Sequence, residues 1–80
     1  MRSNEIEKQL RHRPFMPFRL RMSDGTGYDV RHPEMLLISR TVIAVAVYQT
    51  RSKEPEGVIL CDPVHVIRIE PLVNGARRRR

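Results

Sequence analysis

The sequence predicts a mainly β domain: a small, strongly bent antiparallel barrel with a short N-terminal helix. Five or six short apolar runs are separated by turn-forming residues, a spacing typical of all-β domains. Helical spacing of apolar residues occurs near the N-terminus. The 80 residues make one domain, with a helix and basic segment at 1–13, the barrel at 14–73 and a disordered arginine-rich tail at 74–80.

A helix is predicted over residues 5–12. Ile6 and Leu10 lie four positions apart and therefore share one helix face. Asn4 followed by Glu7 matches an N-cap with its reciprocal acid, in which each side chain binds a backbone amide of the other. With only two apolar side chains, this helix can cover little of a neighbouring sheet.

The segment PFRLRMSDGTGYDVRHPE predicts a hairpin of strands Phe18–Met22 and Thr26–Arg31, because apolar and polar residues alternate in both. A two-residue loop would slip the register by one residue and bring charge onto the apolar face. A three-residue loop, Ser23–Gly25, avoids this slip and predicts a positive φ at Gly25 in a G1-type bulge. The expected pairs are Met22 with Thr26, Leu20 with Tyr28, Phe18 with Val30, and Arg19 with Asp29.

Four further strands are expected after this hairpin. Pro33 has no amide hydrogen and therefore interrupts the pairing. A polar loop at 51–57 uses Pro55 and Gly57 as turn residues, and Asp62-Pro63 starts a single helical turn. The expected strands are Met35–Ile38, Thr41–Thr50, Val58–Cys61 and Val66–Ile69.

The stretch Val42–Val47 is apolar on both faces of its strand. One face carries Val42, Ala44 and Ala46, and the other carries Ile43, Val45 and Val47. An antiparallel strand with one face in water alternates apolar and polar residues. Because the short helix cannot cover the second face, we expect a homo-oligomer that uses this strand or its neighbours, by edge pairing or by face packing.

The net charge of +6 is confined to the two ends of the chain. Residues 14–76 hold seven basic and seven acidic side chains, whereas 1–13 hold four basic and two acidic ones. Charged ends bind phosphate without sequence preference, or they form solvated tails, and both alternatives stay open. The basic candidates for nucleic-acid contact are Arg11, Arg13, Arg77, Arg78, Arg79 and Arg80.

The tetrapeptide Arg31-His32-Pro33-Glu34 has two interpretations. In the first it is a strand-ending corner in which Glu34 caps amides or pairs with Arg31. In the second, Arg31, His32 and Glu34 line a small pocket together with Tyr28.

Neither catalysis nor a cofactor is expected. Structural zinc takes four ligands, whereas this chain offers one cysteine, Cys61, and the scattered His12, His32 and His65. A Cys61–His65 nucleophile pair lacks an orienting group, because Asp62 points to the opposite side of the strand. We therefore predict that the protein is not an enzyme and binds no metal.

Location is predicted from the cysteine count and from hydropathy. A lone cysteine fits a reducing, cytoplasmic setting. No apolar run approaches the roughly 20 residues that span a bilayer. The N-terminus also lacks the apolar centre of a signal peptide.

The stretches LRHRPFMPFRLRMSDG and HVIRIEPL resemble the Sm/LSm family, including its bacterial Hfq branch. The resemblance covers residues 4–71 and implies a bent five-stranded SH3-like barrel, ring-shaped oligomers and RNA as the ligand. Of the family's Lys-His pair for uridine only His65 matches, because Val64 precedes it. The family's Asp after the second strand has no clear counterpart, and the loop 51–57 is longer than in Hfq.

The chain is more similar to short uncharacterised bacterial proteins that share a PFR…DG…HPE…RIEPL framework, a likeness that implies no activity. Two functional hypotheses result. The first is a non-enzymatic, oligomeric Sm-like barrel that binds single-stranded RNA through His65 and the basic ends. The second is a protein-interaction or assembly module without a nucleic-acid ligand, in which the neutral barrel is the functional surface.

Overall fold

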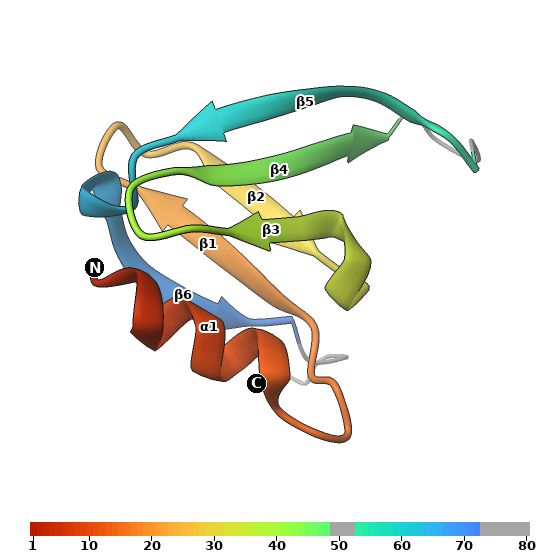
Figure 1. Cartoon of the computed structure of the whole chain (residues 1–80), viewed down its shortest axis with the longest axis horizontal. Helices are drawn as coiled ribbons and strands as arrows, with labels where there is room; N and C mark the ends of the chain where they lie inside the picture. Colours follow the sequence, from red (N-terminus) through yellow and green to blue (C-terminus); the bar gives the residue numbers. More distant parts are fainter. Residues whose placement is uncertain (49–52, 73–80) are drawn as a thin grey trace, which may run out of the picture.

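The structure, a computed structural model, describes residues 1–48 and 53–72. These residues form an N-terminal helix and six antiparallel strands in two three-stranded sheets, with strand orders β2-β1-β6 and β3-β4-β5 (Figure 1). The mainly β prediction is thereby confirmed. The elements are α1 Ser3–Arg11, β1 Phe18–Met22, β2 Gly27–Val30, the 3-10 turn η1 Pro33–Met35, β3 Leu36–Ile38, β4 Ile43–Tyr48, β5 Pro55–Cys61, the 3-10 turn η2 Pro63–His65 and β6 Val66–Pro71.

The core lies between the inner faces of the two sheets. Every second residue of β1 is buried, as period-2 alternation requires, and β4 follows the same pattern at Ile43 and Val45. Helix α1 lies beside β6 (Figure 1), contacts β3 and inserts the fully buried Ile6. The buried apolar residues of the described chain are Ile6, Phe18, Leu20, Met22, Val30, Leu36, Ile43, Val45 and Val66.

The β1–β2 hairpin has the predicted register. Leu20 pairs with Tyr28 and Arg19 with Asp29. Gly25 has a φ of +92°, and its amide donates to the Met22 carbonyl at 2.9 Å, which closes the three-residue loop. The predicted positive φ is confirmed. The Asp24 carboxylate accepts from the Thr26 amide at 2.9 Å and so fixes the exit of the turn.

The predicted N-cap of the helix is wrong. The helix begins at Ser3 after Arg2, which makes no side-chain capping hydrogen bond, so Asn4 lies inside the first turn. Glu7 binds Arg11 one turn later at 2.8 Å instead of reaching back to a cap. The start of α1 is held by the Met1 nitrogen, which donates to the Pro63 and Val66 carbonyls at 3.1 and 2.8 Å.

Several strand boundaries differ from the prediction. Strand β2 is one residue shorter at each end than the predicted Thr26–Arg31, β4 starts at Ile43 and not at Thr41, and β6 continues past Ile69 to Pro71. Met35 ends η1, so β3 starts one residue later than expected, at Leu36. Pro55 and Gly57 lie in β5 and not in a turn, because the β4–β5 pairing continues through them to the end of β4. The helical turn after Asp62 is confirmed as η2, where the Asp62 carboxylate accepts from the Val64 amide at 3.0 Å. Residues 49–50, the predicted end of β4, and the predicted tail at 74–80 lie outside the described residues.

Replacing Gly25 with alanine tests the loop conformation. No heavy atom lies within 4 Å of the added Cβ, so the cost comes only from the left-handed backbone. We expect a loss of about 1–2 kcal/mol in the free energy of unfolding, measured by urea denaturation. Gly57 is the matched control, because its added Cβ also meets nothing within 4 Å and its φ is not positive. Equal effects of G25A and G57A would contradict the assigned turn.

Candidate interaction surface

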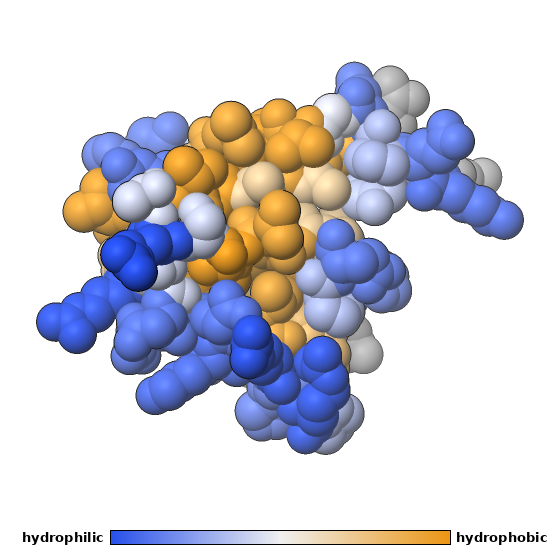
Figure 2. All heavy atoms as spheres, viewed as in Figure 1, coloured by the Kyte–Doolittle hydropathy of each residue, from blue (hydrophilic) through white to orange (hydrophobic). Residues whose placement is uncertain are grey.

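The outer face of the β3-β4-β5 sheet is apolar. Leu37 pairs with Ala44, Ala44 with Leu60, and Ala46 with Val58, so these five residues form two adjoining rows. The side chains on the two flanking strands protrude: Leu37 is 74% exposed, Leu60 69% and Val58 59%. Figure 2 shows a continuous hydrophobic surface where Figure 1 places these three strands. We call Leu37, Ala44, Ala46, Val58 and Leu60 the outer apolar face.

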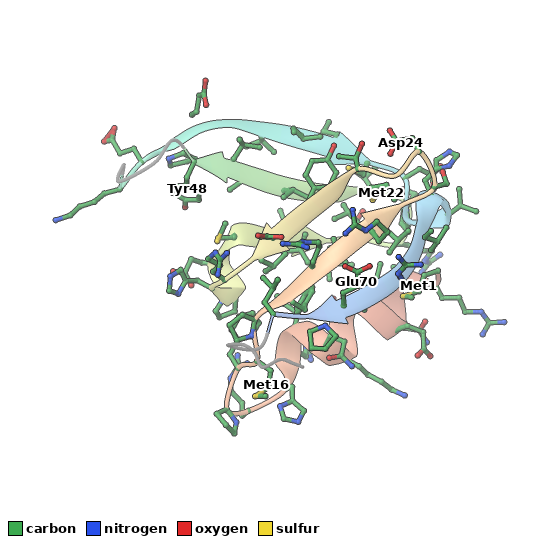
Figure 3. All side chains as sticks on the ribbon, turned by 180° about the vertical axis from the view of Figure 1, so that it is seen from behind. Met1, Met16, Met22, Asp24, Tyr48 and Glu70 are labelled. Carbon is green, nitrogen blue, oxygen red and sulfur yellow. The ribbon has the colours of Figure 1, made fainter. Side chains whose placement is uncertain are left out.

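The outer face of the other sheet, β2-β1-β6, carries ion pairs. Arg19 binds Asp29 across β1 and β2, as the register predicts. Arg21 binds Glu70 across β1 and β6 at 3.1 Å, and Arg68 binds the same carboxylate at 2.7 Å. Figure 3, seen from behind, shows Glu70 on this side of the molecule. The two sheets therefore present outer faces of opposite character.

The ion pairs keep both carboxyl groups charged. Hydrogen bonds from Arg21 and Arg68 lower the pKa of Glu70 to about 2. The hydrogen bond from Arg19 lowers the pKa of Asp29, and the same contact raises the pKa of Arg19. The three arginines thus share two carboxylates within the chain, which partly offsets their charge and reduces their attraction for an external phosphate.

Residues 31–34 form a corner that separates strand β2 from strand β3, as Pro33 predicts. Arg31 binds the Asp29 carboxylate at 3.3 Å, so its observed ion-pair partner is Asp29 and not Glu34. His32 precedes η1 and makes no side-chain cap; its carbonyl accepts from the Met35 amide at 3.0 Å. Glu34 is exposed in η1.

Tyr28, the fourth residue of the predicted pocket, lies near the end of β2 that follows the β1–β2 turn. Its pKa is raised, first by burial and then by the nearby Cys61 and Asp24. Asp24 lies in the turn between β1 and β2 (Figure 3). Arg31, His32 and Glu34 follow the opposite end of β2, so the pocket stays a prediction that no observed contact supports.

The candidate RNA contacts in the described residues already have internal partners. The His65 ring nitrogen Nδ1 lies 3.1 Å from the Ser23 hydroxyl, and the His65 carbonyl accepts from the Ser23 amide at 2.7 Å. Arg11 pairs with Glu7, and Arg13 donates to the Leu10 and His12 carbonyls at the end of α1. Residues 77–80 lie outside the described residues.

The remaining groups with reactive or metal-binding chemistry are apart from one another. Cys61 is half-buried, and burial raises the pKa of its thiol, which disfavours the nucleophilic thiolate. Asp62 is engaged with the Val64 amide. Within 1–48 and 53–72, no group of three His, Cys, Asp or Glu side chains could hold a metal ion.

A shallow, open depression of about 650 Å³ lies where the start of α1, the β3–β4 turn and η2 meet. Arg2, Ser3, Arg40, Thr41 and Asp62 are among its lining residues. The two arginines are exposed, and no buried polar side chain points to a ligand there, among the residues that the structure describes. We therefore assign no ligand to this depression.

No family model, curated protein or solved structure matches this chain. Among the described residues, no helix is both long and apolar enough to cross a membrane. In the described residues, the outer apolar face differs most from the polar surface of a typical monomeric domain, because exposed Leu and Val side chains gather there.

Acid titration tests the ion-pair face. The folded pKa of Glu70 lies below its usual 4.5, so its contribution to stability is present above about pH 4.5 and is lost as the pH falls towards 2. We expect the free energy of unfolding to fall over this range, and Glu70→Gln to flatten the fall. The measurement is urea denaturation at a series of pH values. Glu34→Gln, outside this cluster, is the control and keeps the wild-type slope. An identical slope in E70Q would show that the ion pairs do not couple to folding.

Proposed function

We propose that this protein is a non-enzymatic assembly module that associates with a second copy of itself through the outer apolar face. One observation supports the proposal above all: Leu37, Val58 and Leu60 are exposed on either side of the half-buried Ala44 and Ala46, and no charged side chain lies among the five. Monomeric proteins rarely leave a contiguous patch of this kind in water unless it is used. Face packing is thereby favoured over edge pairing, which the sequence left open.

Burial of this face provides the driving force. Removing apolar surface from water contributes roughly 25 cal/mol per Å², or about 1.5–3 kcal/mol for a fully buried Leu or Val side chain. Leu37, Val58 and Leu60 have most of this contribution still available, since each is more than half exposed. The Ala residues between them allow a close approach of another sheet.

We further propose that the two sheets are the two halves of a small SH3/Sm-like barrel. The order of elements supports this: an N-terminal helix, then strands, then a single helical turn before the last strand, as the Sm/LSm resemblance implies. RNA binding remains the alternative function, carried by His65 and the basic ends. The internal partners of His65, Arg11 and Arg13 favour the assembly module over RNA.

A charge placed on the face tests self-association. We expect wild-type protein to form dimers or larger oligomers in sedimentation equilibrium. Val58→Arg will dissociate them, because a guanidinium buried without a partner costs more than the valine contributed. The matched control is Ile67→Arg, because Ile67 is similarly exposed, 53% against 59% for Val58, but lies on β6 of the other sheet. A monomeric wild type, or equal loss in both variants, would refute the proposal.

Single-stranded RNA tests the alternative. If the assembly module is right, RNA measured by fluorescence anisotropy will bind weakly, with steep salt dependence, and removal of residues 77–80 will abolish binding. Tight binding that survives both truncation and high salt would instead favour a specific RNA site on the folded domain.

A further inference from the structure

The outer apolar face has a defined relief. Between Ile43 and Tyr48, the residues of the middle strand β4 on this face are the small Ala44 and Ala46, and both are half-buried. On one side β5 raises Val58 and Leu60 well above this floor. The face therefore has a furrow along β4, defined by Ala44 and Ala46, and beside it a ridge along β5, defined by Val58 and Leu60.

Ridge and furrow match each other in size and position. The pairing places Leu60 beside Ala44 and Val58 beside Ala46, so both features have the same length and the same spacing along their strands. Two such faces interlock if the ridge of each enters the furrow of the other. We propose that a second copy occupies this face in that arrangement, with the two-fold axis parallel to the strands. The inference rests on the proposed self-association and adds its geometry.

The charges at the ends of these strands support the same arrangement. The ridge is followed by Asp62 and preceded by Glu56, so it has an acidic residue at each end. The furrow strand is preceded by a basic residue, Arg40 in the β3–β4 turn, whereas Lys53 lies two residues before the ridge strand β5. In the described structure Arg40, Lys53 and Glu56 form no ion pair.

A two-fold axis parallel to the strands keeps equivalent ends together. It brings Asp62, at the end of the ridge, towards the partner's Arg40, at the start of the partner's furrow strand, twice in each dimer by symmetry. A two-fold axis across the strands would instead place furrow over furrow, with Ala facing Ala between raised rows. That arrangement leaves an empty channel, which close-packed interfaces avoid. Both packing and charge thus favour the first arrangement.

Filling the furrow distinguishes the interlocked arrangement from nonspecific association through an apolar surface. Ala46→Leu makes the face more apolar, and it also occupies the space that the partner's Val58 needs. We expect the dimer dissociation constant to rise about tenfold or more in sedimentation equilibrium, as overpacking does in protein interiors. Circular dichroism and urea denaturation confirm that each variant is folded. Unchanged or tighter association of A46L would overturn the interlocked arrangement.

A volume exchange provides the second arm of the test. Val58→Ala trims the ridge and weakens the dimer, and Ala46→Val alone also weakens it. The double variant moves the bulk from ridge to furrow, and we expect it to recover most of the lost affinity. Additive losses in the double variant would overturn the arrangement. If V58R dissociates the protein while these variants behave additively, self-association stands and only its geometry fails; a monomeric wild type would remove both.

Discussion

The middle strand β4 carries apolar residues on both of its faces, and the rest of the account depends on what covers each face. Ile43 and Val45 point into the core and are buried, whereas Ala44 and Ala46 lie on the opposite side. The neighbouring strands add Leu37, Val58 and Leu60 to that side. A sheet whose two faces are both apolar needs cover on both, and the chain itself supplies cover for only one in the described residues. We propose a partner at the outer face because the described chain leaves that face uncovered.

The second sheet shows the usual solution to the same problem. Its inner face contributes Phe18 and Leu20 to the core, and its outer face is covered by guanidinium and carboxylate groups that pair across strands. Gly27 leaves room for this layer, because a Cβ there would lie 2.9 Å from a carbon of the Arg19 side chain. The contrast between the sheets lies in the sequence of their outward positions, since both have three strands and antiparallel pairing. The solvated outer face of β2-β1-β6 and the proposed association through the outer face of β3-β4-β5 both rest on that contrast.

The hairpin could be predicted in detail because its information is local. Alternation fixed which residues share a face, and only a three-residue loop placed Arg19 opposite Asp29, so the register and the positive φ of Gly25 were both correct. The apolar character of β4 on both faces was also visible in the sequence. Its neighbours Leu37, Val58 and Leu60 were not recognised as part of the same surface, because the side that they face depends on the register of β3 and β5 against β4, which includes a bulge near Tyr48.

The errors have related causes. The Asn4–Glu7 pattern resembles a cap, but Glu7 forms an ion pair with Arg11, and the helix start is held by the Met1 nitrogen on distant carbonyls. Pro55 and Gly57 resemble turn residues, but β5 is an edge strand of its sheet, where a proline is tolerated. The Glu70 cluster was missed because β6 meets β1 only in the tertiary fold. Local signals were reliable where no long-range contact competed with them.

The most direct measurement of the central claim is a methyl NMR spectrum of the wild-type protein recorded from micromolar to millimolar concentration. Self-association through β3, β4 and β5 predicts that the methyl signals of Leu37, Val58 and Leu60 shift or broaden as the concentration rises. The methyl signal of Ile67, on the other sheet, should stay in place. Constant signals throughout the series, or shifts confined to residues outside the outer apolar face, would contradict the claim.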